Sequence, residues 1–166
     1  MDPLHYSSLR DVARRIQSRQ ISPVELTARM LDRIAALDPK LKSYATVMRE
    51  QALDEAKRAE EEIQRGMYRG PLHGVPIAVK DLCYTKGVRT MAGTRVYANF
   101  IPDHDATVVT RLSRAGAVLL GKLNLSEGAT AGYNPCAIAI RRCDGDSPCR
   151  LSGSAEHDER DGASRP

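Results

Sequence analysis

The chain has 166 residues, of which 42% are hydrophobic and 28% are charged, so a disordered, collagen-like or membrane-embedded chain is excluded. Its net charge of +4 comes from 25 basic and 21 acidic residues that are interspersed along the sequence, and this balance predicts no nucleic-acid partner. No apolar run reaches the length that would span a bilayer, so no membrane partner is expected.

The first part of the sequence predicts two amphipathic helices. Over residues 7–20, apolar residues recur at the spacing of a helix. Ser22 then supplies a capping hydroxyl, Pro23 suits the first helical position, and Glu25 suits the third. We expect this second helix to end at Asp38, because Pro39 disfavours helical dihedral angles in the residue before it.

A short strand and a third helix come next. Residues 43–48 contain tyrosine, threonine and valine in weak alternation, which favours a strand. A helix is predicted over residues 50–65, with Gly66 as its left-handed cap. Its charged residues are interpreted as a solvated face without function: Glu55, Lys57, Arg58, Glu60, Glu61 and Glu62.

The segment 76–120 has the pattern of a strand, a helix and a second strand. The runs Pro76-Ile77-Ala78-Val79 and Ala117-Val118-Leu119-Leu120 are short, apolar and bounded by breakers, which predicts buried strands. Between them, Asp105-Ala106-Thr107 indicates the start of a helix, whose apolar side is predicted to be Val108, Val109, Leu112 and Ala115. The pattern predicts an α/β fold in which helices pack on a mixed, partly parallel β-sheet.

Residues 136–166 differ in composition from the sequence before them. They contain three of the four cysteines but no lysine, no valine and no aromatic residue, and no helical or strand-like periodicity persists. Such a segment cannot bury enough apolar surface to offset the entropy of ordering it. We therefore expect residues 1–135 to form the structured part and residues 136–166 to be a disordered tail.

Lys80 carries the strongest indication of chemistry. It follows a predicted buried strand and precedes a glycine-rich loop, which is where sheet proteins place functional groups. Partial desolvation of an ammonium group favours its neutral form, and a neutral lysine can act as a general base. The alternative is a structural role, in which Lys80 reaches water or pairs with a carboxylate such as that of Asp81.

Several motifs resemble the amidase signature family. The segment Gly70-Pro71-Leu72-His73-Gly74-Val75-Pro76-Ile77-Ala78-Val79-Lys80-Asp81 is similar to the family segment that carries the catalytic lysine. The resemblance continues through Thr90-Met91-Ala92-Gly93-Thr94, Asp105-Ala106-Thr107-Val108-Val109, Ala115-Gly116-Ala117-Val118-Leu119-Leu120-Gly121-Lys122-Leu123-Asn124 and Glu127-Gly128. It covers nearly all of residues 7–135, which corresponds to the first part of a longer domain, and it implies the amidase signature fold with its sheet incomplete in this chain.

The resemblance implies hydrolysis of carbon–nitrogen (amide) bonds by a nucleophilic serine, a second serine bridging through a cis peptide bond, and a lysine. Only the lysine has a counterpart here, at Lys80. The family segment that holds both serines has no match in this sequence. Ser152-Gly153-Ser154 is not that segment, because a charged run follows it where the family has small and apolar residues. We therefore expect the chain to be inactive alone.

The cysteines bear on compartment and metal binding. Cys83, Cys136, Cys143 and Cys149 are too few and too clustered for a secreted disulfide scaffold, and the N-terminus shows no export signal, so a cytoplasmic protein is expected. The last three cysteines and His157 have side chains of the kinds that bind zinc, but they lack the close cysteine pair of a zinc site. No metal and no cofactor is predicted.

The tail also admits an explanation at the level of the gene. The resemblance ends after Pro135, where the periodicity and the aromatic residues end as well. Translation of residues 136–166 out of the ancestral frame would account for all three changes. This hypothesis predicts that another frame of the gene restores a segment rich in glycine and serine and an apolar helix.

Three functions stay open at this point. The first is a fragment of an amidase that acts on a small-molecule amide. The second is a glutaminase-type subunit of a tRNA-dependent amidotransferase, although Leu125-Ser126-Glu127-Gly128-Ala129 is more similar to the amidases. The third is a non-catalytic remnant or interaction module. An incomplete sheet would leave an exposed edge, through which the chain is expected to self-associate.

Overall fold

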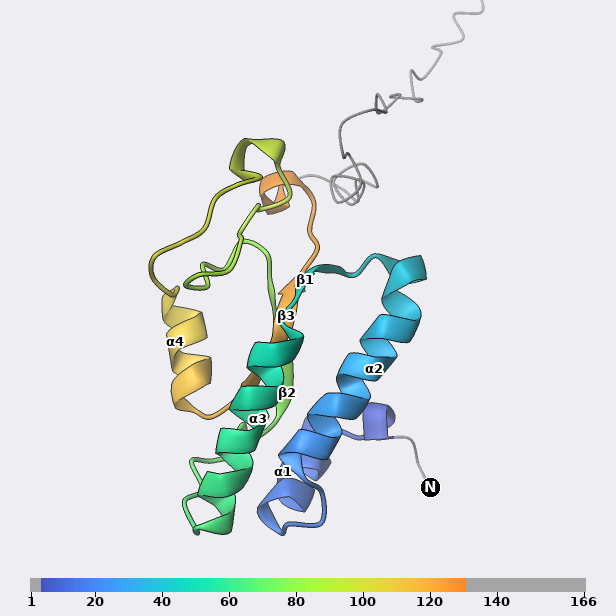
Figure 1. Cartoon of the computed structure of the whole chain (residues 1–166), viewed down its shortest axis with the longest axis vertical. Helices are drawn as coiled ribbons and strands as arrows, with labels where there is room; N and C mark the ends of the chain where they lie inside the picture. The colour runs from blue at the N-terminus through green and yellow to red at the C-terminus, as the bar shows by residue number, and fades with distance from the viewer. Residues whose placement is uncertain (1–3, 131–166) are drawn as a thin grey trace, which may run out of the picture.

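The computed structural model describes residues 4–130 (Figure 1). Its helices are α1 (Leu9–Gln17), α2 (Pro23–Leu41), α3 (Arg49–Gln64) and α4 (Thr107–Arg114), and its strands are β1 (Tyr44–Val47), β2 (Pro76–Lys80) and β3 (Val118–Leu123). Short 3₁₀ turns lie at Leu4–Tyr6, Arg95–Tyr97 and Glu127–Ala129. The predicted tail of residues 136–166 lies outside the described residues, as do its cysteines, His157 and the Ser152-Gly153-Ser154 motif.

The three strands form one mixed sheet in the order β1-β3-β2. β2 and β3 are parallel, with Lys80 opposite Leu123, and the connection between them contains α4. β1 is antiparallel to β3 on its other side. The predicted α/β class, the crossover unit and the partly parallel sheet are thereby confirmed.

Helices cover both faces of the sheet, because alternate residues of β3 point to opposite sides. Val118 and Leu120 pack with Leu31 of α2 and with Ala52 and Ala56 of α3. Leu119 packs on the opposite face with β2 and with Val109 of α4. Figure 1 shows the same arrangement, with α4 on one side of the sheet and α2 and α3 on the other.

The start of α2 was predicted correctly, but its end was not. The Ser22 hydroxyl accepts the Glu25 N–H at 3.1 Å, and Pro23 occupies the first helical turn. The predicted stop at Asp38-Pro39 is wrong, because α2 continues to Leu41 with Pro39 inside it. Pro39 has no N–H to donate to the Ala35 carbonyl, so the helix continues past it with one helical hydrogen bond fewer. The Asp38 carboxylate instead accepts the N–H groups of Ser43 and Tyr44 just beyond the helix.

α4 begins at Thr107, within the predicted start Asp105-Ala106-Thr107, but it is not capped as the sequence indicated. Asp105 does not cap the helix; its carboxylate accepts the backbone N–H of Lys86, at 2.7 Å, in the preceding loop. Ala106 is the N-cap residue, and it makes no side-chain cap hydrogen bond. Val108, predicted on the apolar side, is 47% exposed, whereas Val109 is buried. The tertiary contact of Asp105 therefore replaced the local cap that the sequence indicated.

The charged face of α3 is not wholly solvated as predicted. Glu55 is half-buried, and its Oε2 accepts the backbone N–H of Leu119 at 2.8 Å. That N–H belongs to β3 beyond the point where β1 ends. Glu55 thus satisfies a strand donor that has no strand partner, which would otherwise carry a desolvation cost of about 1–3 kcal/mol.

Glu62, the second exception on α3, contacts a fully buried histidine. His73 accepts the backbone N–H of Arg69 at Nδ1, at 3.1 Å, and its Nε2 lies 3.0 Å from Glu62 Oε2. The Arg69 guanidinium binds the same carboxylate. Because Nδ1 accepts a hydrogen bond, the ring is neutral and carries its proton on Nε2. This cluster joins the end of α3 to the segment that leads into β2.

Because of the cluster of His73, Glu62 and Arg69, we expect the free energy of unfolding to decrease in acid. Burial lowers the pKa of His73 below its ordinary value of 6.5, and the hydrogen bond from Arg69 lowers the pKa of Glu62 below 4.5. The unfolded chain therefore binds more protons than the folded chain below pH 6.5 at His73, and below pH 4.5 at Glu62. The free energy of unfolding should fall as the pH decreases, by at most about 1.4 kcal/mol per pH unit for each proton.

Urea unfolding between pH 7 and pH 5 would measure this dependence. His73→Gln should flatten it in the upper half of the range, because the substituted chain has no imidazole to protonate. His5→Gln, at an exposed position, serves as the matched control and should keep the wild-type slope. Identical slopes in the wild type and His73→Gln would contradict the assignment.

Candidate active site at the end of strand β2

Lys80 is the last residue of β2, and its side chain is exposed, so it reaches water and the partial desolvation expected for its ammonium group is not observed. Its Nζ donates a hydrogen bond to the backbone carbonyl of Asn124, at 3.0 Å, just beyond the end of the parallel strand β3. Among the described residues, no carboxylate forms an ion pair with Lys80. The alternative pairing with Asp81 is therefore absent, and the partner of the lysine is an uncharged oxygen.

Asn124 is itself fixed by the chain that enters β1. Its side-chain Nδ2 donates to the Lys42 carbonyl at 2.6 Å, and its backbone N–H donates to the Ser43 carbonyl at 2.8 Å. Lys42 is the left-handed C-cap of α2. The acceptor of the Lys80 ammonium is thus anchored through two bonds to a segment distant in sequence, which limits the positions that the lysine can take.

Asp81, the next residue, belongs to a buried polar cluster with Lys122 and Thr90. These three side chains are 2%, 0% and 2% exposed, respectively. Lys122 Nζ lies 3.4 Å from Asp81 Oδ1 and donates to Thr90 Oγ1 at 2.7 Å. The other carboxylate oxygen, Oδ2, accepts the backbone N–H of Met91 at 3.0 Å. A lysine and an aspartate can be buried together here because each meets an oppositely charged partner.

Two opposing effects act on the pKa of Lys122 in this cluster. Burial lowers the pKa of Lys122, and the Asp81 carboxylate acts in the opposite direction, with a smaller contribution from Cys83. The cluster also fixes the loop after β2. The Asp81 carbonyl accepts the Ala92 N–H at 3.1 Å, and the Ala92 carbonyl accepts the Gly128 N–H at 2.9 Å.

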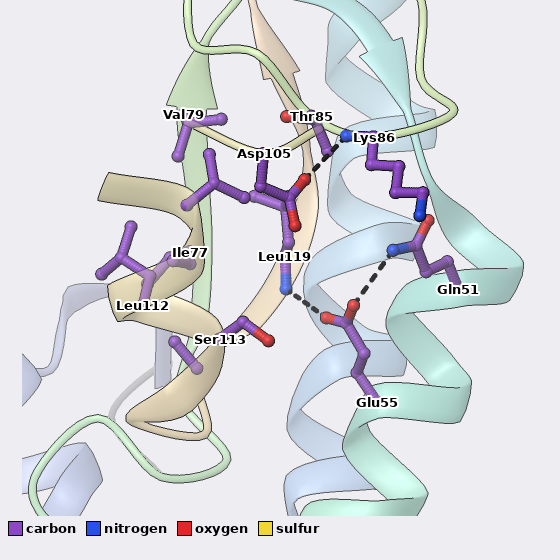
Figure 2. Close-up of a pocket in the computed structure, with 12 residues that line it drawn as sticks. Gln51, Glu55, Ile77, Val79, Thr85, Lys86, Asp105, Leu112, Ser113 and Leu119 are labelled. Carbon is purple, nitrogen blue, oxygen red and sulfur yellow. Dashed lines mark hydrogen bonds between the residues drawn. The ribbon is translucent and has the colours of Figure 1, made fainter. Parts of the chain in front are cut away.

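A separate cavity of about 230 Å³ lies between α3 and α4. Figure 2 shows its floor, made by Ile77 and Val79 of β2 and Leu119 of β3, with Glu55 on one wall and Asp105 near the top. Both carboxylates are already occupied by backbone N–H groups. Lys80 does not line this cavity, so the cavity and the end of β2 are different places on the molecule.

The described residues 4–130 contain no group of three histidine, cysteine or acidic side chains that could hold a metal ion. They also include no helix that is both long and apolar enough to cross a membrane. Cys83 is a free, half-buried thiol.

Sequence reasoning placed Lys80 correctly at the end of a strand but missed Lys122. The missed signal lies in Val118-Leu119-Leu120-Gly121-Lys122-Leu123, where a single lysine interrupts an apolar strand. Lysine is rare in this chain, with 6 residues against 19 arginines. A lysine in such a run must either reach water or meet a buried anion, and Lys122 meets Asp81.

Comparison with known proteins agrees with the motifs. The family model described as Amidase matches residues 25–136. Over 134 residues, the chain is 53% identical to the AmiD protein of Mycobacterium tuberculosis, whose name assigns it to the amidases. That match covers 81% of this chain and 28% of the relative.

A second group of relatives carries another name. The chain is 45% identical over 126 residues to a glutamyl-tRNA(Gln) amidotransferase subunit of Carboxydothermus hydrogenoformans, a match that covers 76% of this chain and 26% of that protein. The chain thus spans between a quarter and a third of the length of the curated relatives it matches.

Solved structures support the fold. The peptide amidase of Stenotrophomonas maltophilia aligns with a TM-score of 0.71 and 40% identity, over 75% of this chain and 26% of that enzyme. A bacterial aryl acylamidase of the amidase signature family aligns with a TM-score of 0.70 and 27% identity, over 76% of this chain and 27% of that enzyme. Residues 4–130 therefore have the architecture of the N-terminal part of an amidase signature fold.

Proposed function

The chain belongs to the amidase family, and on that premise we propose that it is the N-terminal part of a carbon–nitrogen hydrolase in which Lys80 is the general base. The observation that carries the proposal is the contact of Lys80. Its Nζ meets a neutral carbonyl at the open end of two parallel strands, while the adjacent carboxylate is engaged by another lysine. A lysine without a carboxylate partner can lose and regain its proton more readily than a paired one.

The proposed chemistry is acyl transfer through a serine. Neutral Lys80 takes a proton through a bridging serine from the nucleophilic serine, whose oxygen attacks the amide carbon and forms a tetrahedral intermediate. Collapse of that intermediate breaks the carbon–nitrogen bond, and the proton held by Lys80 goes to the leaving amine. Water then cleaves the acyl-serine. The hydrogen bond to the anchored Asn124 carbonyl would hold Nζ in place during both proton transfers.

The two serines are proposed to lie outside the part of the family domain that this chain matches. The chain alone is then inactive, residues 1–135 act as a donor of the lysine and its supporting strands, and residues 136–166 take no part. The substrate of the complete enzyme would be a small-molecule amide. Self-association through the outer edge of β2, an edge strand among the described residues, stays a prediction.

The second candidate is a glutaminase-type component of an amidotransferase, which would pass the released ammonia to a partner active site. The 45% identity to the amidotransferase protein of Carboxydothermus hydrogenoformans favours it, and the 53% identity to AmiD favours the simple hydrolase. Both use the same proposed lysine. A non-catalytic remnant is the third candidate, and it predicts no activity in any assembled form.

A chimera tests the proposal. Residues 1–135 of this chain would replace the matching segment of the Stenotrophomonas maltophilia peptide amidase, whose aligned part is 40% identical. We expect the chimera to hydrolyse a peptide amide and the 166-residue chain alone to release no ammonia from it. Glutamine as a second substrate would separate the hydrolase from the glutaminase.

The melting temperature of the chimera, compared with that of the parent enzyme, controls for folding. A folded chimera without activity would contradict the proposed role of this segment and favour the remnant. Turnover by the 166-residue chain alone would instead overturn its predicted inactivity, and the nucleophile would then have to be found within this sequence.

A further inference from the structure

Two lysines lie near the carboxyl ends of the parallel strands β2 and β3 but meet different partners. Lys80 ends β2 and contacts the Asn124 carbonyl, whereas Lys122 lies on β3 and contacts the Asp81 carboxylate. Asp81 follows Lys80 directly in the chain. Asp81 is therefore the chain neighbour of a lysine proposed to act as a base, and its carboxylate contacts a lysine with no role in the proposed chemistry.

The carboxylate matters for both amines because Asp81 contacts Lys122 and is joined directly to Lys80 in the chain. An uncompensated carboxylate close to an ammonium group favours the charged form of that group, even where the ammonium is exposed to solvent. Such a carboxylate would hold Lys80 in its charged form and oppose the uptake of a proton from the serine. A positive charge 3.4 Å from Asp81 Oδ1 cancels most of the field of that carboxylate.

We propose that Lys122 is a positioning residue for Lys80, because it neutralises the buried Asp81 carboxylate and so leaves Lys80 with an uncharged partner. The inference rests on the proposed function, in which Lys80 is the base. It assigns to a fully buried lysine a purpose beyond packing, and it explains why an ion pair occupies a position in β3 where an apolar residue would cost less to bury.

The contacts of the cluster support a second part of the same role. Thr90 accepts from Lys122, and Met91 N–H donates to Asp81, so both partners of the ion pair hold the loop after β2. That loop contacts the segment after β3 through the bond from Gly128 N–H to the Ala92 carbonyl. The Asn124 carbonyl that receives Lys80 begins this segment.

The reactivity of Lys80 toward an acylating reagent tests the proposal without any amide substrate. The 166-residue chain would be pulsed with limiting acetic anhydride at pH 8, and mass spectrometry would give the acetylation of Lys80 relative to Lys57. Lys57 is exposed on α3 and serves as the internal reference. Only the neutral amine reacts, so the ratio reports how readily Lys80 loses its proton.

The measurement is made on four chains that form a double-mutant cycle: the wild type, Lys122→Met, Asp81→Asn, and the double variant. Lys122→Met should lower the Lys80 to Lys57 ratio by about fivefold, because Asp81 is then uncompensated. Asp81→Asn and the double variant should keep the ratio within about twofold of the wild type or raise it, since neither retains the carboxylate.

The pattern across the four chains separates the proposed role from a structural one. If the cluster only maintains the fold, all three variants should shift the ratio together, and that result would overturn the proposal. An unchanged ratio in Lys122→Met, or equal ratios in all four chains, would overturn it as well. Because the assay needs no serine, its outcome is independent of whether the chimera hydrolyses amides.

Discussion

Lys80→Ala should reduce kcat/KM for amide hydrolysis by the chimera about 10³-fold, which corresponds to about 4 kcal/mol of lost transition-state stabilisation. Alanine removes the group that is proposed to accept the serine proton. It leaves the Asn124 carbonyl and the ion pair of Asp81 with Lys122 in place, so the fold should change little. Steady-state kinetics on a peptide amide would measure the loss.

Lys80→Arg separates proton acceptance from positive charge. A guanidinium keeps the charge but stays protonated at any working pH, so this variant should lose nearly as much activity as Lys80→Ala. Lys57→Ala is the matched control. Lys57 is exposed on α3, and its Nζ lies 3.6 Å from the Asp54 carboxylate. Because Lys57 makes no contact with Lys80, kcat/KM should not change in this variant. A Lys80→Arg chimera with a tenth or more of the parental activity would contradict the base assignment.

Local signals account for the part of the fold that the sequence predicted. Ser22 and Pro23 form a helix start with neighbours only three residues away, and Gly66 caps α3 in the left-handed conformation. The strand-helix-strand pattern over residues 76–120 likewise limits the topology, because a crossover of this length joins parallel strands. Each of these signals is contained in a short segment, so it can be recognised without knowing what packs against it.

The site could be predicted only in part, because its decisive contacts join distant segments. The position of Lys80 follows from the strand that precedes it, but its acceptor lies 44 residues further on. Glu55 and Leu119 meet across 64 residues, and nothing in the sequence of α3 distinguishes Glu55 from its solvated neighbours. The same holds for Asp81, which the sequence offered only as a partner of Lys80, whereas the sheet places Lys122 beside it.

Two helix ends that look alike offer a test of how tightly His73 is packed. Gly66 ends α3 and Gly116 ends α4, with φ angles of +81° and +79°. Both termini close with the same pair of backbone hydrogen bonds: Gly66 N–H to the Ile63 carbonyl and Met67 N–H to the Glu62 carbonyl, and correspondingly Gly116 to Ser113 and Ala117 to Leu112. They differ in what surrounds them. A Cβ on Gly66 would meet nothing within 4 Å, whereas one on Gly116 would lie 2.4 Å from His73 Cδ2.

Gly116→Ala should therefore lower the free energy of unfolding by about 3 kcal/mol or more, and Gly66→Ala by only about 1 kcal/mol. The smaller value is the cost of a left-handed alanine, which both variants share. The excess comes from the fully buried histidine ring, whose Nδ1 accepts the Arg69 N–H and whose Nε2 lies 3.0 Å from Glu62 Oε2, which leaves the ring little room to retreat. Urea unfolding of the 166-residue chain, followed by tyrosine fluorescence, would compare the two.

In a His73→Ala background the additional cost of Gly116→Ala should fall to that of Gly66→Ala, because the clash is gone. Equal costs for the two glycines in the wild-type background would mean that the ring can move aside, and the buried histidine would then be a less rigid link between α3 and β2 than its contacts indicate.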